Sequence, residues 1–170
     1  LVTAIGGGVI RDLLVGQIPP HSLQTGTYVV LTILVTLALF ALYKTHYRRR
    51  RAGIWVRRSY LMADALGLAS FTVTGVSVGL ANFPDYMVLS IILGTVTAVG
   101  GGMIRDVLAQ RIPSVLREEV YALPAIVGAT LYCFLAQGDF SAWAVIISFL
   151  TVLGIRLMAI YFHWHLPKVR

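Results

Sequence analysis

The residues whose types and spacing could do chemistry occur twice in the chain. Val2 to Asp12 reads Val-Thr-Ala-Ile-Gly-Gly-Gly-Val-Ile-Arg-Asp, and Val96 to Asp106 reads Val-Thr-Ala-Val-Gly-Gly-Gly-Met-Ile-Arg-Asp. Each copy lies in an apolar stretch, where every glycine weakens a helix by about 1 kcal/mol relative to alanine. Duplicated, helix-weakening segments that carry charge are typical of membrane transport proteins built from two repeats.

The glycine triplets favour two interrupted helices that cross near the middle of a membrane. Such an interruption survives only where the freed backbone groups are buried in protein or face a watery cavity. We therefore expect main-chain carbonyls to line a path for an ion. The competing interpretation is close helix packing, because small residues let two backbones touch. The candidate residues are Gly6, Gly7, Gly8, Gly100, Gly101 and Gly102.

The charges after the glycines, Arg11-Asp12 and Arg105-Asp106, are predicted to guard the two mouths of this path. A charge at the centre of a membrane helix costs about 3 kcal/mol on insertion scales. Neighbouring residues of a helix do not face each other, so we expect each arginine to find a partner on another helix or to reach a membrane surface. A cation path also requires each arginine to be paired with a carboxylate or with backbone carbonyls. The alternative is that both arginines anchor helix ends.

A stripe of hydroxyl groups offers further ligands for a monovalent cation. Ser70, Thr74 and Ser77 recur at helical spacing, and Thr3 and Thr97 directly precede the glycine segments. Hydroxyl and carbonyl oxygens are the groups that line cation pores. An equally strong alternative is that these hydroxyls bond to their own helix or hold neighbouring helices together.

Composition places the chain in a membrane. It is 58% hydrophobic and 12% charged, with a mean hydropathy of +0.81. About 20 apolar residues are needed to cross the hydrocarbon core as a helix. The sequence contains no nucleophile–base pair, phosphate-binding loop or metal-ligand cluster, so we expect no enzyme activity, no metal and no cofactor other than a permeant cation. The predicted spans are 1–15, 27–43, 60–81, 86–109, 120–137 and 142–162.

The basic residues predict the orientation of these spans. The net charge is +7, and the segment 44–58 is the most basic part of the chain. Basic loops face the cytoplasm, and the loops near 17–24, 81–85 and 137–141 contain no Lys or Arg. We therefore predict a cytoplasmic C-terminus and contact of Arg48, Arg49, Arg50 and Arg51 with lipid head groups rather than nucleic acid. Arg156 is expected to reach the cytoplasmic surface.

The repeat offset predicts an all-α, polytopic architecture with inverted symmetry. Moving from Val2 to Val96 superimposes the first two spans on the fourth and fifth, whereas the span 60–81 has no counterpart. We therefore expect a further helix before residue 1. The resulting single transmembrane domain, 1–170, has repeat one at 1–43, a basic loop at 44–58, repeat two at 59–137 and a final helix at 142–162.

Two Gly-Gly-Gly-x-Ile-Arg-Asp-x-Leu segments, Gly6 to Leu14 and Gly100 to Leu108, resemble the prokaryotic trimeric intracellular cation (TRIC) channel family. The segment from Asp64 to Gly75 is similar to the fourth helix of that family. The resemblance implies seven helices in two inverted triplets plus one, and a homotrimer with a pore in each protomer. It also implies that the pore passes potassium between helices kinked at the glycines.

Two other functions fit the same pattern. Inverted repeats with interrupted helices also serve secondary transporters, here of a small amino acid such as glycine. A structural or regulatory membrane protein that binds lipid or a partner through its arginine run is the third alternative.

Overall fold

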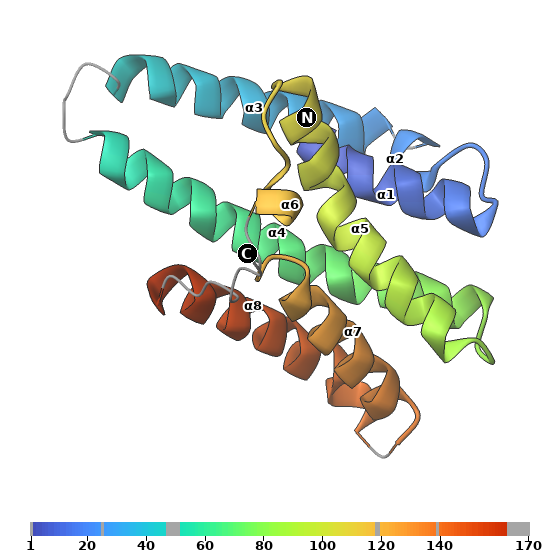
Figure 1. Cartoon of the computed structure of the whole chain (residues 1–170). Helices are drawn as coiled ribbons and strands as arrows, with labels where there is room; N and C mark the ends of the chain where they lie inside the picture. The colour runs from blue at the N-terminus through green and yellow to red at the C-terminus, as the bar shows by residue number, and fades with distance from the viewer. Residues whose placement is uncertain (1, 25, 47–51, 118–119, 139, 163–170) are drawn as a thin grey trace.

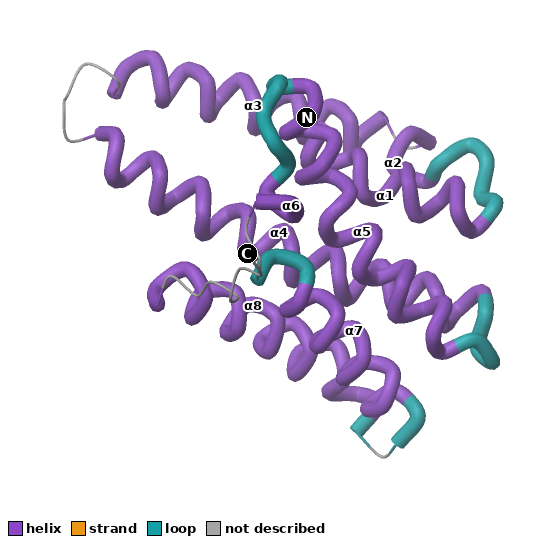
Figure 2. The backbone as a smooth tube through the Cα atoms, viewed as in Figure 1, coloured by secondary structure: helices purple, strands orange, loops and turns teal. Residues whose placement is uncertain are grey.

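The computed structural model describes residues 2–24, 26–46, 52–117, 120–138 and 140–162, and in these residues the chain is helical with short connections (Figures 1 and 2). The prediction of an all-α fold is confirmed. The elements in chain order are α1 (Val2–Val15), α2 (His21–Gln24), α3 (Gly26–His46), α4 (Ala52–Asn82), α5 (Met87–Leu108), α6 (Ser114–Arg117), α7 (Leu123–Ala136), the 3-10 turn η1 (Ser141–Trp143) and α8 (Ala144–Phe162).

Three segments of the described chain are long and apolar enough to cross a membrane: Val56–Asn82, Met87–Leu108 and Ser141–Phe162. Two shorter apolar helices, Gly26–Leu42 and Leu123–Ala136, correspond to the other internal spans predicted from the sequence. The outward faces of these helices carry large apolar side chains, which is the pattern of surfaces that meet lipid rather than water.

The segment 44–58 is less of a loop than the sequence predicts. α3 continues to His46 and α4 begins at Ala52, so both ends of the predicted basic loop are helical. The physical reason is that Ala, Arg and Lys are good helix formers, and a positive-inside segment need not be irregular. Arg48, Arg49, Arg50 and Arg51 lie outside the described residues, and their contact with lipid stays a prediction. The bounds of the two repeats also stay a prediction.

Small residues bring α4 and α5 into close contact. A Cβ atom on Gly75 would lie 2.7 Å from the Cα of Gly94, and one on Gly79 would lie 2.7 Å from the Oγ of Ser90. Helices in lipid gain little from hydrophobic burial against each other, so they associate through this kind of close backbone packing. α7 and α8 cover the other side of α4, where Leu68 and Val152 are almost fully buried.

The order long helix, short helix, long helix occurs twice, as α1-α2-α3 and as α5-α6-α7 (Figure 1). The two copies end their first helix in the same way. Gly16 (φ +79°) and Gln110 (φ +53°) occupy equivalent positions in the left-handed region. In both, the following residue donates its N–H to the carbonyl of the aspartate, from Gln17 to Asp12 and from Arg111 to Asp106. This is the Schellman arrangement of a helix C-terminus.

Candidate functional site

The two glycine segments meet each other, because α1 packs directly on α5. A Cβ on Gly7 would overlap the carbonyl oxygen of Thr97, and one on Gly101 would lie 2.5 Å from the carbonyl oxygen of Thr3. The two contacts are equivalent under the repeat. Only glycine allows such an approach.

Both triplets lie within continuous α-helices, so the predicted break in the helices is wrong, whereas a kink at the glycines stays a prediction. All six glycines are buried. The alternative from the sequence, close packing, accounts for their contacts. The reason is that the packing of two helices against each other more than offsets the weak intrinsic helix propensity of glycine.

Each arginine of the repeated segments pairs with the aspartate that follows it. Arg11 Nη2 lies 2.7 Å from Asp12 Oδ1, and Arg105 Nε lies 2.9 Å from Asp106 Oδ1. The prediction that each arginine is paired with a carboxylate is confirmed, whereas the expectation that neighbours would not pair is wrong. Helix geometry separates the Cβ directions of neighbours, but the arginine side chain is long enough to fold back over the next residue.

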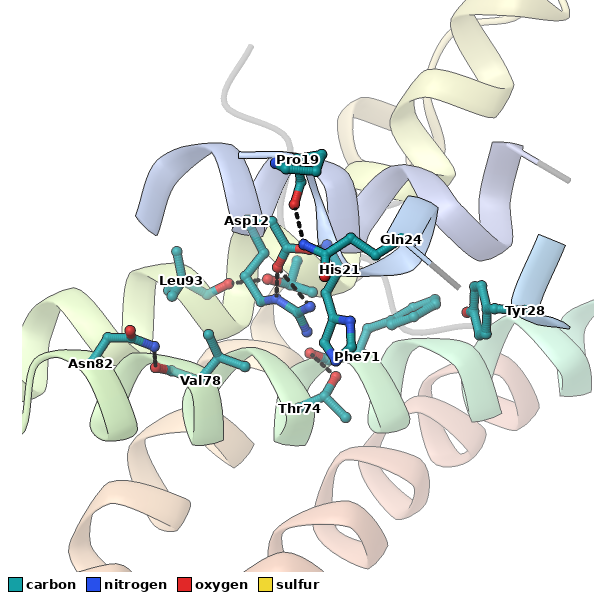
Figure 3. A network of polar contacts seen from close by, with 12 residues as sticks. Asp12, Pro19, His21, Gln24, Tyr28, Phe71, Thr74, Val78, Asn82 and Leu93 are labelled. Carbon is teal, nitrogen blue, oxygen red and sulfur yellow. Dashed lines mark hydrogen bonds and ion pairs between the residues drawn. The ribbon is translucent and has the colours of Figure 1, made fainter. Parts of the chain in front are cut away.

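The second oxygen of each aspartate holds the loop that follows. Asp12 Oδ2 accepts a hydrogen bond from the backbone N–H of His21 at 2.8 Å, and Figure 3 shows these residues side by side at the end of α1. Asp106 Oδ2 accepts from the N–H of Ser114 at 2.8 Å and from its hydroxyl at 2.9 Å. The donor is shifted by one residue in repeat one because Pro20 stands where repeat two has Ser114, and proline has no N–H.

Asp64, on α4, is the centre of a cluster that also contains Arg105, Tyr121 and Arg156. Its Oδ1 accepts hydrogen bonds from Arg105 Nη1 and from the Tyr121 hydroxyl, both at 3.2 Å. Its Oδ2 lies 3.9 Å from Arg156 Nη2. The Asp64 cluster therefore ties α4 to α5, to α8 and to the segment before α7.

Arg156 does not reach a membrane surface. Its side chain is 3% exposed, donates to the carbonyl oxygen of Val120 at 3.3 Å, and lies 4.5 Å from the centre of the Tyr121 ring. The expectation of a surface-seeking arginine is wrong, because Asp64 and the aromatic ring supply partners inside the protein.

A pocket of about 200 Å³ adjoins the cluster, between α1, α4 and α5. Its polar lining comes from Thr3, Tyr60, Asp64, Arg105 and Tyr121, and the remaining lining residues are apolar or glycine. Of the residues predicted from the sequence, Thr3, Gly102 and Arg105 line it. The pocket thus combines one guanidinium with a carboxylate and three hydroxyl groups, and the oxygens of these last groups can replace part of the hydration shell of a small cation.

The other predicted hydroxyls lie elsewhere. Ser70, Thr74 and Ser77 share an exposed face of α4. The Thr74 hydroxyl donates to the carbonyl oxygens of Ser70 and Phe71, and Figure 3 shows Thr74 beside Phe71. Thr97 is fully buried and donates to the Leu93 carbonyl at 2.6 Å. The contacts of Thr74 and Thr97 therefore match the alternative interpretation from the sequence, in which each hydroxyl bonds to its own helix.

Sequence reasoning missed the two tyrosines of the pocket. Tyr60 stacks on Arg105, with the guanidinium carbon 5.2 Å from the ring centre, and Tyr121 donates to Asp64. A signal was present for Asp64 alone, as an acidic residue inside a predicted span. Such a residue almost always faces the bundle interior and pairs with other charges.

Comparison with known proteins agrees with this geometry. The model of the Glycine transporter family matches residues 1–44 and 61–137. A UPF0126 membrane protein of Vibrio cholerae is 41% identical over 98% of this chain and 67% of its own length. The UPF0126 inner membrane protein YadS of Escherichia coli is 35% identical over 98% of this chain and 78% of its own length.

Solved structures show the same fold. A structure from work on conductance through TRIC cation channels has a TM-score of 0.85 at 35% identity, over 99% of this chain and 80% of that one. A prokaryotic TRIC channel crystallised in 0.5 M KCl has a TM-score of 0.86 at 27% identity, over 97% of this chain and 80% of that one. The TRIC orthologue from Rhodobacter sphaeroides has a TM-score of 0.79 at 30% identity, over 96% of this chain and 80% of that one.

The chain belongs to the TRIC family and has its helical fold. It is an integral membrane protein whose relatives are bacterial membrane proteins, and the inner membrane is its location.

Proposed function

We propose that the chain is a channel for monovalent cations, chiefly potassium, and that the pocket between α1, α4 and α5 is part of the ion path. The observation that carries the proposal is the position of this pocket. It adjoins the crossing of the two glycine segments and contains the carboxylate of Asp64 beside three hydroxyl groups. The solved relatives with this fold are described as cation channels.

Charge balance supports a cation as the permeant ion. Arg105 would repel a cation if its charge were uncompensated, but it lies within hydrogen-bond distance of Asp106 and of Asp64. Arg11 is likewise neutralised by Asp12. Paired arginines leave the hydroxyl oxygens of the pocket lining to set the local potential.

The assembly we propose is a homotrimer, supported by the trimeric relatives in the family. Membrane lipid would cover the remaining apolar faces. Transport of a small amino acid such as glycine is the second candidate, favoured by the description of the matching family model. Inverted repeats serve both kinds of transport.

Recording in planar bilayers tests the proposal. Purified protein in asymmetric potassium and sodium solutions should give unitary currents that reverse near the potassium potential. Saturable uptake of labelled glycine into vesicles, without unitary currents, would instead select the transporter. Absence of both activities would contradict the proposal.

The variant Gly67→Leu tests whether ions pass through the pocket. A Cβ on Gly67 meets no atom within 4 Å although this residue lines the pocket, so leucine should fill the space without disturbing the helices. We expect the unitary current to fall strongly. Gly154→Leu is the matched control, since Gly154 also has open space around it but lies on α8, away from the pocket. Equal currents in both variants would remove the pocket from the path.

A further inference from the structure

We propose that Arg105 is a latch that closes the pocket by bridging α5 to Asp64 on α4, and that it opens by withdrawing onto Asp106 alone. The inference rests on the proposed channel function and adds a mechanism of regulation to the same site. In the present structure the guanidinium binds both carboxylates, with Nε 2.9 Å from Asp106 and Nη1 3.2 Å from Asp64. It therefore spans the pocket between the two helices.

The two bonds differ in how firmly they are held. Asp106 lies next to Arg105 in the chain and is fixed by two hydrogen bonds from Ser114. Asp64 lies on a different helix, so its bond to Arg105 depends on the spacing of α4 and α5. Removing the only partner of a buried charge is strongly unfavourable, but Arg105 keeps Asp106 when it leaves Asp64. The bridge can open without creating an unpaired arginine.

The negative charge of Asp64 is also compensated after Arg105 has withdrawn from it. The Tyr121 hydroxyl remains bonded to its Oδ1, and Arg156 remains near its Oδ2. Loss of Arg105 from Oδ1 would leave a lone pair of the carboxylate facing the pocket, where a cation can bind. Opening therefore couples removal of a positive charge to exposure of a negative one.

The bridged state is incompletely bonded. Arg105 Nη2 is buried, next to Gly102, and has no hydrogen-bond partner among the described residues. A buried donor without a partner costs free energy, so the bridged arrangement is not held as firmly as it could be. Two arrangements of comparable free energy are what a gate requires.

The other repeat provides a natural comparison. Within the described part of the chain, the ion pair of Arg11 is with its neighbour Asp12, and no carboxylate from a second helix joins it. The latch is therefore specific to the α4–α5 side.

Single-channel recording of Asp64→Asn tests the latch. Asparagine removes the charge that draws Arg105 across the pocket, so the ratio of open to closed time should rise about 10-fold, the size expected for a hydrogen bond between charged groups. The unitary potassium current should fall, because the exposed carboxylate is lost. A purely structural role for Asp64 would lower stability without raising the open time.

Tyr121→Phe gives a second, milder variant with the opposite expectation. Without the hydroxyl, Asp64 Oδ1 keeps Arg105 as a donor in the bridged state but has no such donor after release. The variant should therefore favour the bridged state and lower the open-to-closed ratio several-fold. Tyr28→Phe is its control, since the Tyr28 hydroxyl donates to the carbonyl of Ala4, neither residue lines the pocket, and its loss should leave gating unchanged.

The outcomes separate the latch from the channel function. Currents in the wild type with an unchanged or lower open-to-closed ratio in Asp64→Asn would overturn the latch alone, as would a higher ratio in Tyr121→Phe. A silent wild type with an active Asp64→Asn would support a closed latch. Silence of both proteins would overturn the channel function and the latch with it.

Discussion

At the scale of single residues, the repeated Arg-Asp pair does two tasks with one carboxylate. One oxygen of Asp12 or Asp106 neutralises the preceding arginine, and the other receives the N–H that begins the next short helix. A carboxylate that accepts bonds from both sides fixes the arginine and the loop together. The motif therefore acts as a structural clasp between the arginine and the loop that follows.

Asp106→Asn should lower stability by about 1.5–3 kcal/mol, because it removes a charge that accepts hydrogen bonds from Arg105 and Ser114. Thermal unfolding in detergent measures the effect. Asp85→Asn is the control, since this aspartate is exposed in the turn before α5 and should change stability by less than about 0.5 kcal/mol. Equal effects at the two positions would contradict the clasp.

Gln110→Gly should stabilise the chain by up to about 1 kcal/mol, because relief of the left-handed conformation, about 1–2 kcal/mol, outweighs the entropy that glycine adds to the unfolded chain, about 0.4–1 kcal/mol. The repeat supplies the reciprocal change. Gly16→Gln at the equivalent position should destabilise by a similar amount. Chemical or thermal unfolding of both variants checks the sign, and a loss of stability in Gln110→Gly would refute the shared helix-end geometry.

At the scale of helices, the crossing of α1 and α5 depends on glycine. Gly101→Ala places a Cβ 2.5 Å from the Thr3 carbonyl oxygen, so the helices must separate, at about 1–3 kcal/mol for an overpacked contact. Gly154→Ala meets nothing within 4 Å and should be neutral or slightly stabilising, as alanine favours a helix. Melting temperatures of the two proteins provide the comparison, and an unaffected Gly101→Ala would show that the crossing is loose.

The positions of the long helices could be predicted from apolar run length, and the structure places them close to the predicted bounds except at the start of α4, which begins at Ala52 instead of residue 60. The span predicted at 86–109 is α5, Met87–Leu108, and that predicted at 120–137 contains α7, Leu123–Ala136. The short helices α2 and α6 were not predictable in this way, because four residues carry no periodic pattern. Each begins at the residue whose backbone N–H donates to the aspartate of the preceding long helix, Asp12 for α2 and Asp106 for α6.

The site was harder to predict than the fold. Helix propensity correctly identifies the glycines as poor helix formers, but it takes no account of the neighbouring helix whose packing stabilises them. The pairing of Arg156 with Asp64 joins residues from different helices, so it depends on packing that a single sequence does not specify. Arg105 was identified because its type and repetition are informative without a partner.

At the scale of the whole molecule, the orientation in the membrane is an open prediction. Cysteine in place of Asp85 should react with a membrane-impermeant thiol reagent added to intact cells, whereas cysteine in place of Arg111 should react only after permeabilisation. Both positions are exposed and flank opposite ends of α5. The native Cys133 is buried, and the parent chain serves as the unlabelled control. The reverse pattern would invert the topology and place the C-terminus outside.

The matched contacts of Gly7 with Thr97 and of Gly101 with Thr3 act as a fulcrum. The backbones of α1 and α5 are in direct contact there, and no flexible side chain lies between them to accommodate a tilt of one helix. If α1 or α5 tilts about these contacts, the distance between the two helices increases at one end and decreases at the other. A passage beside these contacts cannot widen at both ends through helix tilting alone. Opening it along its whole length requires a separate movement at one end.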